Sequence, residues 1–534
     1  MSTFAGTLAL TRLALRRDRV LLPVWIAVVV YTAVFSAQAT LDLYPTLASR
    51  EQAASAINAV PSLVALYGWI WDPSSLGALA TVKLAAFGAS LIGVLAIMLV
   101  IRHTRREEEN GRFELLGATV VGRRAPLAAA LIVSIGAMIV IGLLTAIGQT
   151  AVGLPAQGSW VFGMAWTAVG TAFAGVAAVT AQLTVSARAA VGWAVAVLTT
   201  AYVLRAMGDT SGRIDGSGWP SWLSPIGWGQ QARAYAGDVW WPLILSIAFT
   251  CLAVVAAYAL SDRRDLGAGL LPDRRGPAQA SARLSTPLGL AWRLQRGLLL
   301  GWVVGYALLG LVLGNIASSV GDMLGSEQVQ DFIQTLGGTQ VLVDAFLALE
   351  FGFLGFFTAA YGVSAAMRLR SEEDSGHAEL LLSTATSRTR WLASHLLVAL
   401  AGTSLLCLVG GGATAVAVAL QGGEVSDAGT VMTGVLVYLP AIWVLTGVVV
   451  LLVGVAPRLA ALAWGVLVAL LLLGELGPLL ELPEWAMNVS PFAHVPRIPG
   501  HAMDWTPVLL LTVLAAGLMA VGAAGLRRRD IEGA

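Results

Sequence analysis

The sequence predicts an all-α polytopic membrane protein with about 12 transmembrane helices, arranged as two parallel six-helix repeats with both termini cytoplasmic. Three observations lead to this prediction. Of the 534 residues, 57% are hydrophobic and only 12% are charged, whereas soluble proteins carry about 25% charged residues. Twelve apolar runs approach or exceed the ~20 residues that a helix needs to cross a bilayer. Two acidic segments recur about half a chain apart.

The apolar runs divide into two sets of six. They lie near 20–38, 77–101, 126–148, 161–184, 189–205 and 241–260, and near 298–319, 343–367, 392–420, 428–453, 459–480 and 506–526. The first run raises the alternative of a cleaved signal peptide, because Ala37-Gln38-Ala39 resembles a signal-peptidase site. The run is long for the apolar region of a signal peptide, about 7–15 residues. We therefore expect a retained helix.

Arginines set the orientation. If the N-terminus is inside, 26 arginines fall in inner segments and five in outer ones, namely Arg50, Arg205, Arg213, Arg233 and Arg497. Such an excess marks the cytoplasmic side of a membrane protein. Ten tryptophans gather at the opposite edge, where indole rings suit the membrane interface. They are Trp69, Trp71, Trp160, Trp219, Trp222, Trp228, Trp240, Trp241, Trp485 and Trp505.

Composition also excludes several functions. Lys83 is the single lysine, and the residues around it do not form the Gly-Lys-Ser/Thr of a phosphate-binding loop, so ATP would have to be bound by a partner. Cys251 and Cys407 lie in apolar runs, which argues against a disulfide framework. The five histidines lack metal-ligand spacing. The net charge of +1 argues against a nucleic-acid partner.

The chain is an internal tandem repeat. Residues 105–116 match 370–381 at an offset of 265, and Arg123 then matches Arg388. Residues 219–225 match 485–491 at 266, and 263–265 match 528–530 at 265. Parallel halves of this kind imply a pseudo-two-fold axis along the membrane normal. We expect a first six-helix half over 1–260, a cytoplasmic linker over 261–290 and a second half over 291–534.

The two acidic segments lie between the second and third expected spans of each half. On a helix starting near Glu107, this residue shares a face with Gly111 and with Glu114 or Leu115. Such a short charged helix with an apolar pair can dock into a groove on a soluble partner. The alternative is a solvated amphipathic connector at the lipid headgroups. Two copies in register favour a docking function.

These segments, together with a Ser-Pro motif in the last outer loop of each half, resemble ABC-2-type permeases. The likeness is strongest to the fused twelve-span group described as exporters of polyketide antibiotics. It implies a permease of the bacterial cytoplasmic membrane that exports hydrophobic or amphipathic compounds such as antibiotics, drugs or lipids. It also implies two copies of a separate ABC ATPase, which bind the ATP and Mg; no cofactor is expected in this chain.

In that family the loop after the second span is a coupling helix that receives the motion of the ATPase. The resemblance assigns this role to Glu107, Glu108, Glu109, Gly111, Arg112, Glu114, Leu115 and Leu116, and to Glu372, Glu373, Asp374, Gly376, Glu379, Leu380 and Leu381. His377 and Ala378 replace Arg112 and Phe113, so the two docking sites are expected to differ. Residues 4–19 fit the amphipathic elbow helix of such permeases, and 288–296 its shorter counterpart; the alternative is a basic flank with no further role.

Three charged residues fall inside expected spans. Lys83 lies in the second span, and Asp344 and Glu350 lie in its counterpart, the eighth. Charges near the middle of a bilayer cost about 2.5–3.5 kcal/mol on insertion scales and usually face a cavity. We therefore expect these residues to line the translocation path, with Lys83 facing Glu350. The alternative is that they reach headgroups or water at the outer end.

Two other classes of protein remain as alternatives. A secondary transporter of the major facilitator type also has twelve spans in two parallel halves, but its usual second loop carries a Gly-x-x-x-Asp-Arg-x-Gly-Arg signature. The long acidic loop here disfavours that class. A polytopic lipid-processing enzyme would need paired polar residues at one membrane face.

Overall fold

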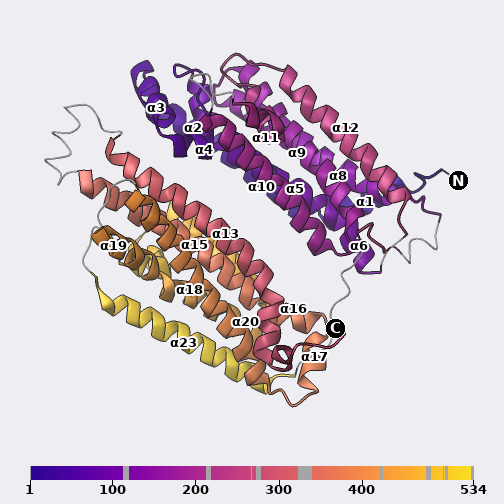
Figure 1. The fold of residues 1–534 in the computed structure, drawn as a ribbon, viewed down its shortest axis with the longest axis vertical. Coiled ribbons are helices and arrows are strands. Elements are labelled where there is room, and N and C mark those ends of the chain that lie inside the picture. Colours follow the sequence, from indigo (N-terminus) through magenta and orange to yellow (C-terminus); the bar gives the residue numbers. More distant parts are fainter. Residues whose placement is uncertain are drawn as a thin grey trace. The chain divides into compact units, whose positions relative to one another are not determined.

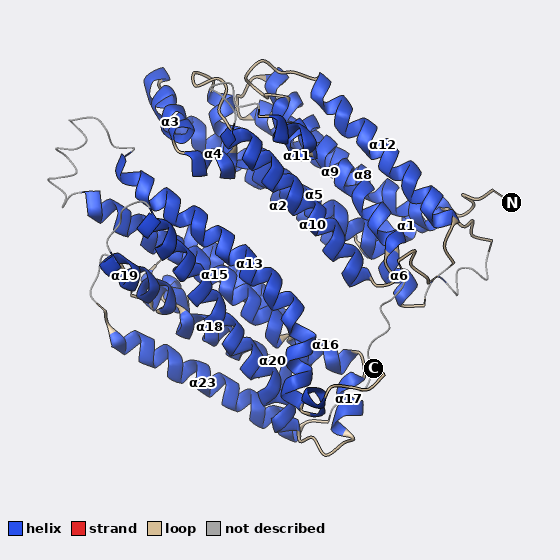
Figure 2. Cartoon of the chain, in the orientation of Figure 1, coloured by secondary structure: helices blue, strands red, loops and turns tan. Residues whose placement is uncertain are grey.

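The computed structural model describes residues 2–111, 113, 120–211, 218–265, 267–271, 278–322, 339–420, 425–476, 483–496, 498–499 and 503–530. All regular elements in these ranges are helices, and none is a strand (Figure 2). The chain divides into two compact units, Met1–Gly276 and Pro277–Ala534. In each unit the long helices run side by side (Figure 1).

The first unit is built on long helices joined by short ones at both ends. Its helices are α1 (Thr7–Arg17), α2 (Leu21–Leu43), α3 (Leu47–Ala59), α4 (Pro61–Tyr67), α5 (Leu76–His103), α6 (Arg105–Glu109), α8 (Ala125–Ala151), α9 (Ala156–Leu183), α10 (Ala187–Ser211), the 3₁₀ helix η1 (Trp219–Leu223), α11 (Pro225–Gln231) and α12 (Trp241–Asp262). Helix α9 is the most buried of them and contacts α5, α8 and α12, so it forms the centre of the bundle.

The second unit follows the same order. Its helices are η2 (Ala282–Ser285), α13 (Pro287–Asp322), α15 (Thr339–Ala366), α16 (Arg368–Asp374), α17 (His377–Leu382), α18 (Arg388–Leu420), α19 (Val425–Leu436), α20 (Leu439–Val455), η3 (Pro457–Leu459), α21 (Leu462–Leu476), α22 (Glu484–Met487), η4 (Pro491–His494) and α23 (Trp505–Arg528). Helix α20 packs against α15 and α23, and α18 packs against α13.

Eleven helices in the described ranges are long and apolar enough to cross a membrane. The protein is therefore a multi-pass membrane protein. Every one of the 12 expected apolar runs contains a helix, but the run at 459–480 contains only the shorter α21. Since residues 477–482 lie outside the described part of the chain, the expected count of 12 spans stays a prediction.

Small residues allow the long helices of each unit to approach closely. A Cβ on Gly142 of α8 would collide with the carbonyl oxygen of Gly163 on α9. A Cβ on Gly454 of α20 would collide in the same way with Gly522 on α23. Lipid offers apolar contacts as good as those of leucine, so helices in membranes associate mainly through such close packing.

Both Ser-Pro motifs begin a short helix. Ser224 precedes α11, and its hydroxyl accepts a hydrogen bond from the amide of Gly227 at 3.3 Å. Ser490 precedes η4, whose first residue is Pro491. Serine before the first helical residue and proline at that residue is the favoured N-terminal arrangement.

Of the two segments expected to form elbow helices, only the first is a separate helix, and its role at the membrane surface stays a prediction. Helix α1 covers most of 4–19, with Phe4, Leu8 and Leu15 exposed. Residues 288–296, however, are the first part of the continuous helix α13, so the prediction of a separate shorter counterpart was wrong. Near the start of each half the repeat offset is 277, since Arg16, Arg19 and Trp25 recur as Arg293, Arg296 and Trp302. The chain breaks after α1 at the buried Asp18, whereas the matching residue in α13 is the neutral Gln295, which a helix accommodates.

Arg205 does not lie in an outer segment, as the arginine pattern predicts, but inside α10, where it is fully buried. Its guanidinium is 3.3 Å from the carboxylate of Asp209 and also donates to the carbonyl oxygens of Val64 and Leu66. A buried cation is tolerated only when it is paired and hydrogen-bonded. The sequence pattern placed this arginine wrongly because basic residues usually mark loops, and because the carbonyl oxygens that accept from it lie about 140 residues earlier in the chain.

The packing of α20 on α23 predicts a strong dependence on Gly522. We expect Gly522→Val to destabilise the second unit by about 1–3 kcal/mol, since the new side chain overlaps the backbone of α20. Gly517→Val, on the same helix with no atom within 4 Å of its Cβ position, is the matched control and should be nearly neutral. Melting of the detergent-solubilised protein measures both, and equal melting temperatures would contradict the prediction.

Candidate functional site at the acidic segments

Glycine ends the first helix of each acidic segment. Helix α6 stops at Glu109 and α16 at Asp374, and the glycines two residues later, Gly111 and Gly376, have φ of +70° and +73°. This left-handed conformation is the usual C-terminal stop of a helix. The expectation that Glu107 and Gly111 share one face of a continuous helix was therefore wrong. In the second unit the chain resumes as the separate helix α17.

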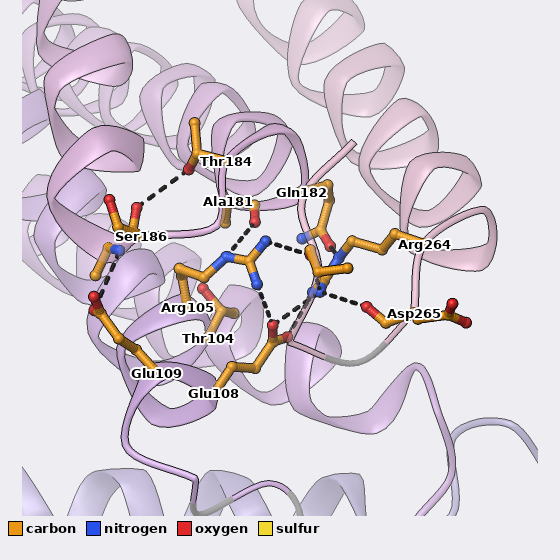
Figure 3. A network of polar contacts seen from close by, with 12 residues as sticks. Thr104, Arg105, Glu108, Glu109, Ala181, Gln182, Thr184, Ser186, Arg264 and Asp265 are labelled. Atoms are coloured by element: carbon orange, nitrogen blue, oxygen red, sulfur yellow. Dashed lines mark hydrogen bonds and ion pairs between the residues drawn. The ribbon is translucent and has the colours of Figure 1, made fainter. Parts of the chain in front are cut away.

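The central acid of the first segment is held by two arginines (Figure 3). Glu108 lies 2.5 Å from Nη1 of Arg105, which is three residues earlier, and 2.5 Å from Nη2 of Arg264, which follows the end of α12. Arg105 is fully buried. Because both carboxylate oxygens are engaged, the bond to Arg264 fixes α6 to the end of the last long helix of its unit.

The same two arginines collect further parts of the chain. Arg105 donates to the carbonyl oxygens of Ala181, at the end of α9, and Ala268, in the expected linker, at 3.1 and 2.7 Å. Arg264 donates to the side chain of Gln182 at 2.7 Å and also to Ala268 at 3.0 Å. Figure 3 shows Arg105 and Arg264 on either side of Glu108, with Ala181 and Gln182 as further partners of the two arginines. We call Arg105, Glu108 and Arg264 the first clamp.

The second unit contains the same arrangement 265 residues later. Glu373 is 3.2 Å from Nη1 of Arg370, and its two oxygens accept hydrogen bonds of 2.5 and 2.8 Å from Arg529, which follows the end of α23. Glu373 is buried. We call Arg370, Glu373 and Arg529 the second clamp. The sequence repeat is thus also a repeat of contacts.

A further matching pair of arginines caps the ends of the last long helices. Arg123 donates to the carbonyl oxygens of Ser261, Asp262 and Arg264 at 2.6–3.3 Å. Arg388, at the same offset, donates to the corresponding carbonyls of residues 526, 527 and 529 at 2.6–3.4 Å. Cations suit the negative end of a helix dipole and satisfy carbonyls that lack partners there.

The first acid of each segment is also engaged within its unit. Glu107 is 2.8 Å from Nη1 of Arg17, at the end of α1. Glu372 pairs with Arg368 on its own helix, and His377 lies 3.7 Å away. These contacts differ between the halves, since the second unit has no separate elbow helix to supply the partner.

Other members of the expected coupling sets face solvent. Glu109 is exposed and accepts a hydrogen bond from the amide of Ala187. Asp374 is exposed while contacting Arg370 at 2.6 Å. Glu379 and Leu380 of α17 are exposed, and Leu381 is half-buried. Four expected residues, Arg112, Glu114, Leu115 and Leu116, lie outside the described part of the chain.

Sequence reasoning missed one buried acid beside this site. Asp18, between α1 and α2, is fully buried and lies 3.0 Å from Arg102 and 2.6 Å from the imidazole of His103. It ties the elbow helix to the end of α5. One signal in the sequence could have indicated this residue. Asp18 directly follows Arg16 and Arg17, at the point where the expected elbow helix meets the first span.

The structure gives the helix on which each expected path residue lies, but it does not show whether these residues lie near one another. Lys83 lies on α5 and is exposed. Glu350 lies on α15 and is partly buried. Asp344 also lies on α15, in a stretch whose side chains are outside the description. The expected pairing of Lys83 with Glu350 joins the two units and stays a prediction.

Comparison with known proteins adds to this geometry. Residues 284–527 match a protein family described as "Multidrug efflux system permease Rv1217c, C-terminal domain". The chain is also 46% identical to the multidrug efflux system permease protein Rv1217c of Mycobacterium tuberculosis, with 99% of this chain and 96% of the relative covered. The chain belongs to this family of multidrug efflux system permeases. The permease and its relative therefore share one architecture along their whole lengths.

We predict that the clamps are essential for the permease to hold its acidic segments in place. Glu108→Gln leaves the buried Arg105 without its counter-charge, and losing one partner of a buried ion pair costs about 3–5 kcal/mol. Glu373→Gln should act in the same direction in the second unit but less strongly, because the side chains of Arg370 and Arg529 are 23% and 17% exposed. Hydrogen exchange of residues 105–111 and 370–376, with thermal melting, measures the effect.

The exposed neighbour Glu109→Gln is the matched control and should change neither measurement. A Glu108→Gln permease with wild-type melting and wild-type protection of residues 105–111 would show that the first clamp contributes no stability.

Proposed function

We propose that this permease is the membrane-spanning subunit of an ATP-driven ABC exporter. It works with two copies of a separate ABC ATPase, and the acidic segments around α6 and α16–α17 are its coupling elements. The observation that supports this most strongly is the duplicated clamp. An acidic segment fixed at the same place in each unit is suited to receive the same partner twice.

Within each segment the residues divide between two roles. Glu108 and Glu373 anchor the segment to its own unit. Glu109, Asp374, Glu379 and Leu380 are exposed and form the docking surface in this proposal. The partner groove is then basic, with an apolar pocket for the leucine, as in other helix-in-groove contacts.

ATP and Mg are bound by the partner in this proposal. A phosphate-binding loop needs a lysine after a glycine-rich turn, and the single lysine of this chain, Lys83, lies in the long apolar helix α5. The permease itself supplies the path and no hydrolytic chemistry.

The exported compounds are hydrophobic or amphipathic, and the membrane is the bacterial cytoplasmic membrane. The relative's printed name describes multidrug efflux, and the apolar helices of this chain suit substrates that partition into lipid. Lys83 is exposed about 10 Å along α5 from its first residue. A lysine at this depth is costly against lipid, which supports a position on a water-containing path with Asp344 and Glu350.

Charge exchange tests the path residues. We expect Lys83→Glu and Glu350→Lys each to reduce efflux of a fluorescent substrate such as ethidium from cells at least fivefold. The double variant should recover most of the activity if the two charges face each other across the path. Matched surface expression is the control, and additive losses in the double variant would contradict the pairing.

Co-purification tests the partner. From membranes of its own host, the tagged permease should bring down an ABC ATPase with vanadate-sensitive activity. Asp374→Lys combined with Glu379→Lys and Leu380→Lys should reduce the recovered ATPase to about half or less, because the second docking surface then repels the basic groove and no longer fills its apolar pocket. Glu484→Lys, an exposed acid on α22 of the same unit, is the control.

The outcomes separate two errors. If the ATPase is recovered in full with the triple variant, the docking surface is misassigned but the transporter class stands. If the permease alone transports substrate in vesicles driven by a proton gradient, the ABC assignment is wrong and the secondary-transporter class replaces it.

A further inference from the structure

An aromatic-lined cavity lies inside the first unit, at the end away from the clamp. Its enclosed volume is about 40 Å³, and the empty space, including the mouth that opens to the outside, is about 550 Å³. Helices α5, α9 and α11 and the segments beside them form its walls.

The walls are large flat side chains and one amide. Trp69 and Trp71 come from the segment before α5, Phe162 and Trp166 from α9, and Gln230 from α11. The remaining lining is mainly small and apolar, including Ala85 of α5. Binding sites for small molecules typically combine such an apolar lining with a few polar groups that fix orientation.

The amide of Gln230 has an unused acceptor. Its Nε2 donates to the carbonyl oxygen of Tyr67 at 3.1 Å, which fixes the orientation of the side chain. Its carbonyl oxygen Oε1 is buried and receives no hydrogen bond from the described residues. A buried acceptor without a donor costs about 1–3 kcal/mol. A ligand with one N–H or O–H group removes that cost.

The rim of the cavity is held in place by polar side chains from helices α10 and α3. Tyr202 of α10 donates to the carbonyl of Leu66 at 2.6 Å, and Arg205 donates to it at 3.3 Å. Asn58 of α3 makes two hydrogen bonds with the backbone of Ile70, at 2.9 and 3.0 Å. The two rim tryptophans flank Ile70, so these bonds position both rings before any ligand binds.

The backbone around Ala234 and Ala236, which line the cavity, is unusual. Arg233, Tyr235 and Asp238 have φ of 48°, 62° and 53°, a region that non-glycine residues rarely adopt. The ring of Tyr235 packs into the space left by Gly77 and Gly158, where any Cβ would collide with it. Residues held in this way cluster at ligand clamps, because the surrounding structure must enforce them.

We propose that this cavity binds a small planar aromatic molecule that carries one hydrogen-bond donor. The rings stack on or pack edge-to-face with Trp69, Trp71, Phe162 and Trp166, and the donor meets Oε1 of Gln230. The site belongs to the first half alone, since Gln230 corresponds to Pro496 at the repeat offset of 266. The two halves of the permease therefore differ in ligand recognition.

A pair of isosteric ligands tests the proposal on the unmodified protein. Indole has one N–H donor, and benzothiophene has the same shape without it. Calorimetry on the full-length permease in nanodiscs should show indole binding at least tenfold tighter than benzothiophene. Equal affinities, or no saturable binding of indole, would overturn the proposal.

Three variants locate the site. Ala85→Phe fills the cavity and should abolish indole binding, and Gln230→Leu should weaken it at least tenfold. Gln231→Leu removes the neighbouring buried glutamine, which does not line the cavity, and should bind indole like the wild type. If either Ala85→Phe or Gln230→Leu binds indole with wild-type affinity, indole binds at another place and the proposal is wrong. Because the assay needs no ATPase, its result is independent of the proposed function.

Discussion

The carboxylates of Glu108, which is partly buried, and Glu373, which is buried, each join two separate parts of a unit. Each is bound by an arginine on its own short helix and by a second arginine 156 residues away, after the last long helix. Leaving either arginine without its acid would expose an uncompensated buried charge, which costs far more than a surface ion pair contributes. The acidic segment therefore cannot move alone. In the proposed coupling, a push on α6 or α16 would act directly on the end of α12 or α23.

This constraint explains why the repeat is strict in some places and loose in others. Arg105, Glu108, Arg123 and Arg264 all recur at an offset of 265, because each depends on the position of the others. Positions outside this network diverge. A glutamine, Gln295, stands in the second half where the first has Asp18. The chain breaks between α1 and α2 at Asp18, whereas Gln295 lies within the continuous helix α13. Gln230 becomes a proline, and with it the acceptor in the aromatic cavity is lost.

The sequence was sufficient for the helical class and the positions of the long helices, since apolar runs of this length leave few alternatives. It was insufficient for contacts between residues distant in the chain. The sequence repeat shows that Arg264 recurs as Arg529. No pattern near Arg264 in the sequence indicates that Arg264 binds Glu108, which lies 156 residues earlier. The helix break at Gly111 was predictable from glycine's tolerance of positive φ, yet the regular spacing of the acids favoured a continuous helix. Arg205 was misplaced because basic residues usually mark loops.

The first clamp also fastens the segment that follows α12. Arg105 and Arg264 both bind Ala268, and the amides of Leu270 and Leu271 donate to the carbonyls of residues 182 and 183. The segment that leads to the second half is thus fixed at the first clamp itself. If α6 receives the movement of an ATPase, as we propose, these bonds pass that movement both to the end of α12 and to residues 268–271.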